Sequence, residues 1–187
     1  GASTGTGEAV EVRDGGAAFG GLGVENAIAA VNGEIAAALK GHDATDQAAI
    51  DKVLIDLDGT ADKSRLGGNA MIATSMAVAH ACAAARKVPL WRSLHDQGTN
   101  PEPPFLPLPE IQIFGGGAHA GSRVDVQDYM VTAVGAETFA QALEWTADVY
   151  RAADVLMKET GRAQGVADEG GLWPNFDDNE QPLDMLV

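Results

Sequence analysis

The sequence predicts an α/β protein of two domains, and three patterns along the chain lead to this prediction. Residues 24–86 carry apolar side chains at helical spacing, in three successive stretches. A proline-rich segment follows between Gly98 and Pro109, where fixed φ angles and missing backbone donors favour an extended connector. Beyond it, strand-like runs precede a long helical pattern. We therefore predict a boundary between residues 1–101 and residues 102–187.

Within residues 1–101, the sequence predicts one short strand and three helices. Residues 8–13 alternate polar and apolar side chains, which is typical of a strand. Apolar residues then recur every three or four positions over residues 24–39 and again over residues 50–57, and a glycine follows each helical run. The alanine-rich residues 69–86 predict a third helix, which small side chains allow to pack closely against its neighbours.

Within residues 102–187, the sequence predicts strands followed by helices. Residues 111–114 and 124–134 are rich in β-branched and aromatic side chains, which favours strands. Residues 139–157 have apolar side chains at helical spacing and predict a long helix. Another helix is expected to begin at Asn179. No stop signal precedes Val187, so we expect this helical pattern to continue beyond the chain.

The charge balance argues against several functional classes. The chain has 27 acidic and 12 basic residues and a net charge of −15. Nucleic acids and anionic membranes both attract clustered lysine and arginine, so the sequence predicts no binding to either. No apolar stretch reaches the length of a membrane helix. Cys82 is the single cysteine, which fits a reducing compartment, and we predict a cytoplasmic protein.

Two glycine-rich segments hold side chains suited to ligand binding. Residues 1–5 place a serine and a threonine between glycines, where hydroxyl and backbone N–H groups can meet a metal ion or a phosphate. A plain flexible terminus is the alternative. Residues 115–121 combine three consecutive glycines with His119, which is typical of a loop that closes on a ligand. A hairpin turn with a surface histidine fits the same residues.

Two other segments carry carboxylates. Gln127 and Asp128 are neighbours in the second predicted strand, where alternation lets one of the two face a cleft. Both are also compatible with a solvated sheet edge. Asp168 and Glu169 precede two glycines, a composition that forms turns. The same loop is suited to hold a carboxylic acid as a general acid, which requires burial or a second carboxylate nearby.

Short motifs run through the chain in a fixed order. They begin with Gly-Ala-Ser-Thr-Gly at residues 1–5 and include Gly-Gly-Ala-His-Ala at residues 116–120 and Asp-Glu-Gly-Gly at residues 168–171. The other motifs are Glu8-Ala9, Arg13-Asp14-Gly15, Gly23-Val24, Val31-Asn32, Asp46-Gln47, Ile50-Asp51, Leu57-Asp58-Gly59-Thr60, Leu66-Gly67-Gly68-Asn69-Ala70, Ser75-Met76-Ala77, Pro89-Leu90, Gln127 and Pro174-Asn175. Together they resemble the enolases, the phosphopyruvate hydratases, over essentially the whole chain.

The resemblance implies an enolase-like α/β fold. Residues 1–101 would form the later, incomplete part of the α+β N-terminal domain, and residues 102–187 the first ββα(α) part of the C-terminal α/β barrel. The family's opening strands and most of its barrel, with the lysine base and three carboxylate ligands of Mg²⁺, would then lie outside this chain. We expect two Mg²⁺ ions per active site and a homodimer or higher homo-oligomer. We expect no activity from these 187 residues alone.

The resemblance also implies a reaction and five residue roles. The reaction is the reversible dehydration of 2-phosphoglycerate to phosphoenolpyruvate in glycolysis and gluconeogenesis. Ser3 would be a ligand of the second Mg²⁺. His119 would close over the substrate phosphate as a catalytic and binding residue, and Gln127 would bind substrate. Glu169 would contact substrate as the general acid that protonates the departing 3-hydroxyl group. Asp128 would replace a glutamate that supports this acid.

The chain departs from the family pattern close to the predicted chemistry. Gly115 stands where enolases usually have asparagine, and Ala167 where they usually have glycine. Asp128 is shorter than the family's glutamate by one methylene group, about 1.5 Å. Two alternatives therefore stand beside ordinary enolase activity: a paralogue acting on a related phosphate or phosphonate enol acid, and a non-catalytic binding protein with the enolase fold. The presence of Ser3 and Glu169 favours catalysis.

Overall fold

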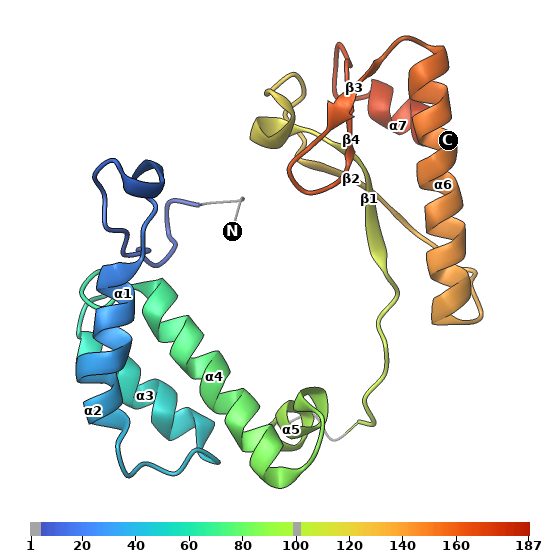
Figure 1. The fold of residues 1–187 in the computed structure, drawn as a ribbon. Helices are drawn as coiled ribbons and strands as arrows, with labels where there is room; N and C mark the ends of the chain where they lie inside the picture. The colour runs from blue at the N-terminus through green and yellow to red at the C-terminus, as the bar shows by residue number, and fades with distance from the viewer. Residues whose placement is uncertain (1–4, 99–101) are drawn as a thin grey trace. The chain divides into compact units, whose positions relative to one another are not determined.

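The computed structural model describes residues 5–98 and 102–187. The chain divides between Pro103 and Pro104 into two compact units, each with its own hydrophobic core (Figure 1). We call them the helical unit, which ends at Pro103, and the sheet unit, which begins at Pro104. Within the described residues, no helix combines the length and the apolar character that a membrane span requires.

The helical unit consists, in its described part, of helices and the loops between them. Its elements are a 3₁₀ turn (Ala18–Gly21), α1 (Glu25–Ala30), a π-helical turn (Val31–Ile35), α2 (Ala36–Leu39), α3 (Gln47–Asp58), α4 (Gly68–Arg86) and α5 (Leu90–Gln97). Its core includes Ile35, Ile50 and Leu54, which are at most 2% exposed. The three predicted helices are confirmed as α1 with α2, α3 and α4.

The strand predicted at residues 8–13 is wrong. In the described residues this segment pairs with the start of α4 instead of with another strand. The carbonyl oxygen of Val10 accepts the N–H of Gly68 at 2.7 Å. The side chain of Asn69 accepts the N–H of Val12 at 3.1 Å and donates to its carbonyl oxygen at 3.0 Å. A side-chain amide thus takes the hydrogen-bonding place of a neighbouring strand.

A buried carboxylate organises the loop from α3 to α4. Asp58 is 2% exposed and accepts the backbone N–H groups of Thr60 at 2.9 Å and Leu66 at 2.8 Å. Burial raises the pKa of the Asp58 carboxyl, but the hydrogen bonds from Thr60 and Leu66 outweigh burial, so its pKa lies below the usual value. Gly59 caps α3 in the left-handed conformation, with φ of 70°.

The sheet unit has a mixed four-stranded sheet in the order β2-β1-β4-β3. Its strands are β1 (Glu110–Gly115), β2 (Asp128–Thr132), β3 (Ala163–Val166) and β4 (Leu172–Pro174). β1 is antiparallel to β2 and parallel to β4, which is antiparallel to β3. Helix α6 (Phe139–Glu159) contacts β1, β2 and β3, and lies beside the sheet in Figure 1. The last helix is α7 (Gln181–Leu186).

The core of the sheet unit contains side chains of the sheet, of α6 and of the loops after β1 and β4. Ile113 and Phe114 of β1 are fully buried, and Met157 of α6 and Phe176 after β4 are 1% exposed. The rings of Phe114 and Phe176 meet edge to face, with centroids 5.3 Å apart. The predicted strand at residues 111–114 and the predicted long helix are confirmed as β1 and α6.

The chain turns back on itself directly after β1. The N–H of Gly116 donates to the carbonyl oxygen of Gln127 at 2.7 Å. A Cβ atom on Gly116 would collide with the carbonyl oxygen of Val126, so this return requires glycine. β2 therefore begins at Asp128, later than the predicted strand 124–134, because the residues before it form the returning loop.

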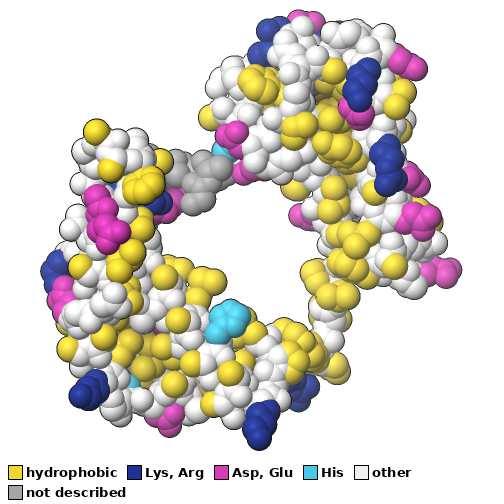
Figure 2. Space-filling model, viewed as in Figure 1, with side chains coloured by type: hydrophobic (Ala, Val, Ile, Leu, Met, Phe, Trp, Pro, Cys, Tyr) yellow, Lys and Arg dark blue, Asp and Glu magenta, His cyan; other side chains and the backbone are white. Residues whose placement is uncertain are grey.

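The proline-rich segment 102–109 has no regular secondary structure. Phe105, Leu106 and Leu108 are 79%, 70% and 50% exposed, and Figure 2 shows hydrophobic side chains along this connector. Proline supplies no N–H for a ladder and fixes φ, which keeps such a segment extended.

We predict that Asp58→Asn destabilises the complete gene product that contains this chain by about 2 kcal/mol at about pH 7, because an amide nitrogen would face a backbone N–H donor. The folded state lowers the pKa of Asp58, so its stabilisation is present above the unfolded pKa of about 3.9 and is lost as the pH falls through the folded pKa. Urea unfolding at several pH values measures both effects.

The matched control is Asp56→Asn, which removes an exposed carboxylate of the same helix and its ion pair with Lys52. We expect a change of about 0.5 kcal/mol or less for it. Equal losses in the two variants, or a loss for Asp58→Asn that does not shrink in acid, would contradict the assignment.

Candidate active site

The predicted site residues come together at one edge of the sheet unit. They are His119 after β1, Gln127 and Asp128 at the start of β2, and Glu169 between β3 and β4. Strand pairing explains the gathering, because Gly115 at the end of β1 pairs with Asp128, and Phe114 pairs with Leu172 at the start of β4. One end of β1 is thereby surrounded by the three loops that carry these side chains. Ser3 lies outside the described residues.

An amide and an imidazole connect the carboxyl groups of the site. Nε2 of Gln127 lies 3.1 Å from Oδ2 of Asp128 and 3.3 Å from Oε2 of Glu169. His119, in the 3₁₀ turn Gly117–Ala120, has Nδ1 3.5 Å from Oδ2 of Asp168 and Nε2 3.8 Å from Oε1 of Glu169. The arrangement offers a carboxyl proton donor beside groups that can orient an anionic substrate.

Burial distinguishes the alternative interpretations of these residues. The side chain of His119 is 8% exposed, so it is not a surface histidine. Asp168 and Glu169 do lie in a turn, closed by a hydrogen bond from the N–H of Ala167 to the carbonyl oxygen of Gly171 at 2.8 Å. Their side chains differ, since Asp168 is 71% exposed and Glu169 29%. The turn therefore keeps Glu169 against the protein.

Gln127 and Asp128 both reach the site, which differs from the expectation that one of them faces it. Gln127 precedes the first residue of β2, where its carbonyl oxygen is held by the N–H of Gly116. The strict alternation of a strand does not apply at that position. The two side chains therefore contact each other and share the same edge of the sheet.

Gln112 is a site residue that sequence reasoning missed. Its Nε2 donates to Oδ1 of Asp128, and its Oε1 accepts the N–H of Gly171 at 2.8 Å. Gln112 lies in β1 between Ile111 and Ile113, of which Ile113 is fully buried. A polar amide inside a buried apolar strand is the signal that could have revealed it, because buried polar groups require hydrogen-bond partners.

The part of the chain that the structure describes holds no group of three or more His, Cys, Asp or Glu side chains placed to bind a metal ion. The one predicted metal ligand, Ser3, is not among these residues.

Family comparison covers both units. The model for the enolase N-terminal domain matches residues 1–94, and the model for the enolase C-terminal TIM barrel domain matches residues 104–187. The chain belongs to the enolase family. The predicted enolase-like α/β fold is thereby confirmed, and the family is one of lyase-type enzymes.

Two departures from the enolase pattern lie against each other. A Cβ atom on Gly115 would be 2.5 Å from the Cβ of Ala167, closer than two carbon atoms approach. The residue that enolases usually carry at position 115, asparagine, therefore does not fit beside the methyl group of Ala167. Positions 115 and 167 are therefore sterically coupled in this chain.

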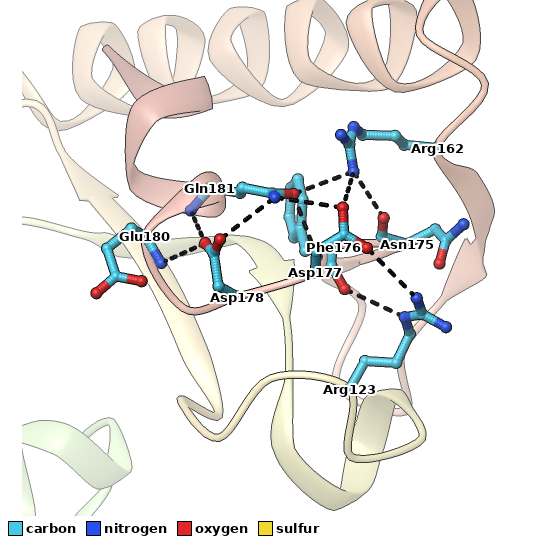
Figure 3. Close-up of polar contacts among 8 residues, drawn as sticks. All are labelled: Arg123, Arg162, Asn175, Phe176, Asp177, Asp178, Glu180 and Gln181. Atoms are coloured by element: carbon cyan, nitrogen blue, oxygen red, sulfur yellow. Dashed lines mark hydrogen bonds and ion pairs between the residues drawn. The ribbon is translucent and has the colours of Figure 1, made fainter.

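Two arginines fasten the loop after β4. Nη1 of Arg162 donates to the carbonyl oxygen of Asn175 at 2.8 Å and to Oε1 of Gln181 at 3.1 Å. Its guanidinium lies 5.9 Å from the ring centroid of Phe176. Nε of Arg123 donates to the carbonyl oxygen of Phe176 at 3.2 Å (Figure 3). Arg123 belongs to the loop that ends at Gln127, so this network holds a site loop against the segment after β4.

A second pair braces the same loop. The N–H of Asp125 donates to Oδ1 of Asn179 at 2.8 Å, and Nδ2 of Asn179 donates to Oδ2 of Asp125 at 3.2 Å. The hydroxyl of Tyr129 in β2 donates to the carbonyl oxygen of Asn179 at 3.3 Å. Burial, followed by the charges of Asp125 and other nearby carboxylates, raises the pKa of Tyr129, so this hydroxyl keeps its proton.

We predict that Gly115→Ala destabilises the complete gene product by about 1–3 kcal/mol, because the added methyl group overlaps that of Ala167. The double variant Gly115→Ala with Ala167→Gly should recover most of this loss. Urea unfolding of the wild type, both single variants and the double variant measures the coupling. Additive effects of the two substitutions would show that the residues do not compensate each other.

Proposed function

We propose that the complete protein catalyses the reversible dehydration of 2-phosphoglycerate to phosphoenolpyruvate, the enolase reaction. One observation carries the proposal: the carboxyl group of Glu169 lies 3.3 Å from the Gln127 amide and 3.8 Å from the His119 ring, turned toward the protein. This is where a general acid must lie if neighbouring groups are to orient the substrate.

Glu169 has the central role in the proposed reaction. Hydroxide is a poor leaving group, so the C–O bond breaks readily only if a proton reaches the departing oxygen. In the dehydration direction, a base outside this chain would take the proton from C2, and Glu169 gives its own proton to the 3-hydroxyl group, which leaves as water while the double bond forms. In the hydration direction, the same carboxylate removes a proton from the attacking water.

The residues around Glu169 are proposed to bind and orient the substrate. Gln127 contacts both Asp128 and Glu169, and its amide can in addition hold a substrate oxygen. Asp128 supports the acid, because it contacts the same Gln127 amide that contacts Glu169. His119, largely shielded from solvent, is proposed to hold the substrate phosphate.

We further propose two Mg²⁺ ions per active site, with Ser3 as a ligand of one of them. When bound, Mg²⁺ stabilises the negative charge that forms on the substrate carboxylate. We also propose a cytoplasmic homodimer that serves glycolysis and gluconeogenesis. The single cysteine supports a reducing compartment.

The exchange at positions 115 and 167 favours a second candidate. It removes the amide that enolases usually carry next to Gln112 and adds a methyl group to the base of the Glu169 turn. A paralogue that acts on a related phosphate or phosphonate enol acid would use the same acid with a reshaped pocket. Faster turnover of a phosphonate analogue than of 2-phosphoglycerate would favour this candidate.

The test is Glu169→Gln in the complete gene product, assayed with 2-phosphoglycerate and Mg²⁺ by the absorbance of phosphoenolpyruvate. We expect kcat to fall at least about 100-fold, because an amide cannot deliver the proton. Glu144→Gln, which changes an exposed carboxylate of α6, is the control and should keep wild-type kcat. Equal activity of the wild type and Glu169→Gln would refute the role of Glu169.

A further inference from the structure

We propose that Gln112 is a positioning residue of this site, whose amide orients the Asp128 carboxyl group and fastens it to the loop that carries Glu169. The inference deepens the proposed function and rests on it. Gln112 lies on β1, Asp128 on β2, and the Glu169 loop between β3 and β4, so one side chain connects three strands of the sheet.

The direction of the Gln112 amide follows from the backbone. A peptide N–H donates and cannot accept, so the Gln112 atom 2.8 Å from the N–H of Gly171 is the oxygen Oε1. The NH₂ group must then face Asp128. Gly171 permits this approach, because a Cβ atom there would lie 2.6 Å from Cδ of Gln112.

Asp128 thereby meets an amide donor on each of its oxygens. Oδ1 accepts from Gln112, and Oδ2 accepts from Gln127 at 3.1 Å. Each amide donates to a different oxygen, so rotation of the carboxyl group would break at least one of the two hydrogen bonds. The two amides therefore fix the orientation of the Asp128 side chain.

This orientation links the two carboxyl groups of the site. The general acid must lie at a fixed position relative to the departing oxygen before the C–O bond breaks. Gln112 holds both Asp128 and the backbone of the Glu169 loop at Gly171. Gln127 connects Asp128 to Glu169, so the position of the acid depends on these amides. Gln112 acts through Asp128 and does not itself meet the substrate.

The lengths of the two side chains also match. Asp128 lacks the methylene group of the family's glutamate, and Gln112 reaches it across the β1–β2 pair, where Gly115 is paired with Asp128. Gln112→Asn with Asp128→Glu keeps the total number of methylene groups between the strands. This double variant should restore the amide–carboxylate hydrogen bond that Gln112→Asn alone breaks.

The experiment uses the complete gene product with 2-phosphoglycerate and Mg²⁺. Gln112→Met keeps the length of the side chain and removes both hydrogen bonds. We expect kcat to fall about 10–100-fold with KM within about threefold, because the acid is affected and substrate binding is not. Gln112→Asn should show a similar loss, and adding Asp128→Glu should recover at least about tenfold of it. The control Gln164→Met changes an exposed amide of β3 and should leave kcat unchanged.

A second measurement does not depend on turnover. In Gln112→Met, the N–H of Gly171 loses its acceptor, so its hydrogen exchange should accelerate at least about tenfold, while the N–H of Ala167 keeps its bond to Gly171. An inactive wild type would refute the enolase reaction. The hydrogen exchange of the Gly171 N–H would then still test its hydrogen bond to Gln112. Unchanged exchange, or Gln112→Met with wild-type kcat in an active enzyme, would overturn the inference. A double variant that recovers nothing would also overturn it.

Discussion

The turn after β1 depends on an approach of two backbone segments that any side chain would prevent. A Cβ atom on Gly116 would collide with the carbonyl oxygen of Val126, and the hydrogen bond from Gly116 to Gln127 holds the two segments together. His119 lies on the segment that follows Gly116, and Gln127 and Asp128 lie on the segment that leads back into the sheet. The site is therefore fixed by main-chain contact, which explains how small loops can hold several polar groups in register.

Long elements could be predicted from the sequence because each buries one face at a regular period. α3 and α6 follow from apolar spacing, and α4 follows from its alanine-rich composition. α5, β3 and β4 could not be found this way, because they are short and show little burial. Trp91 in α5 is 58% exposed, and β3 has no buried residue. Residues 8–13 show why alternating polar and apolar side chains can mislead. The alternation indicates which side chains are exposed, but it does not identify the hydrogen-bonding partner of the backbone. That partner is the side chain of Asn69, which is distant in sequence.

The residues His119, Gln127, Asp128 and Glu169 could be named from motifs because their types and order resemble a known family. The contacts of Glu169 with Gln127 and His119 could not be predicted, because they join positions that are far apart along the chain. Gln112 lies outside every motif, and its position beside Asp128 depends on the pairing of β1 with β2. A sequence thus indicates which chemistry is present more readily than which neighbours hold it in place.

The close fit of Gly115 to Ala167 couples two positions that lie far apart along the chain. A Cβ atom on Gly115 would lie 2.5 Å from the Cβ of Ala167, so a side chain at position 115 and a methyl group at position 167 disfavour each other. The tolerance of a substitution at one position therefore depends on the residue at the other. Changes engineered into either loop have to be designed as a pair.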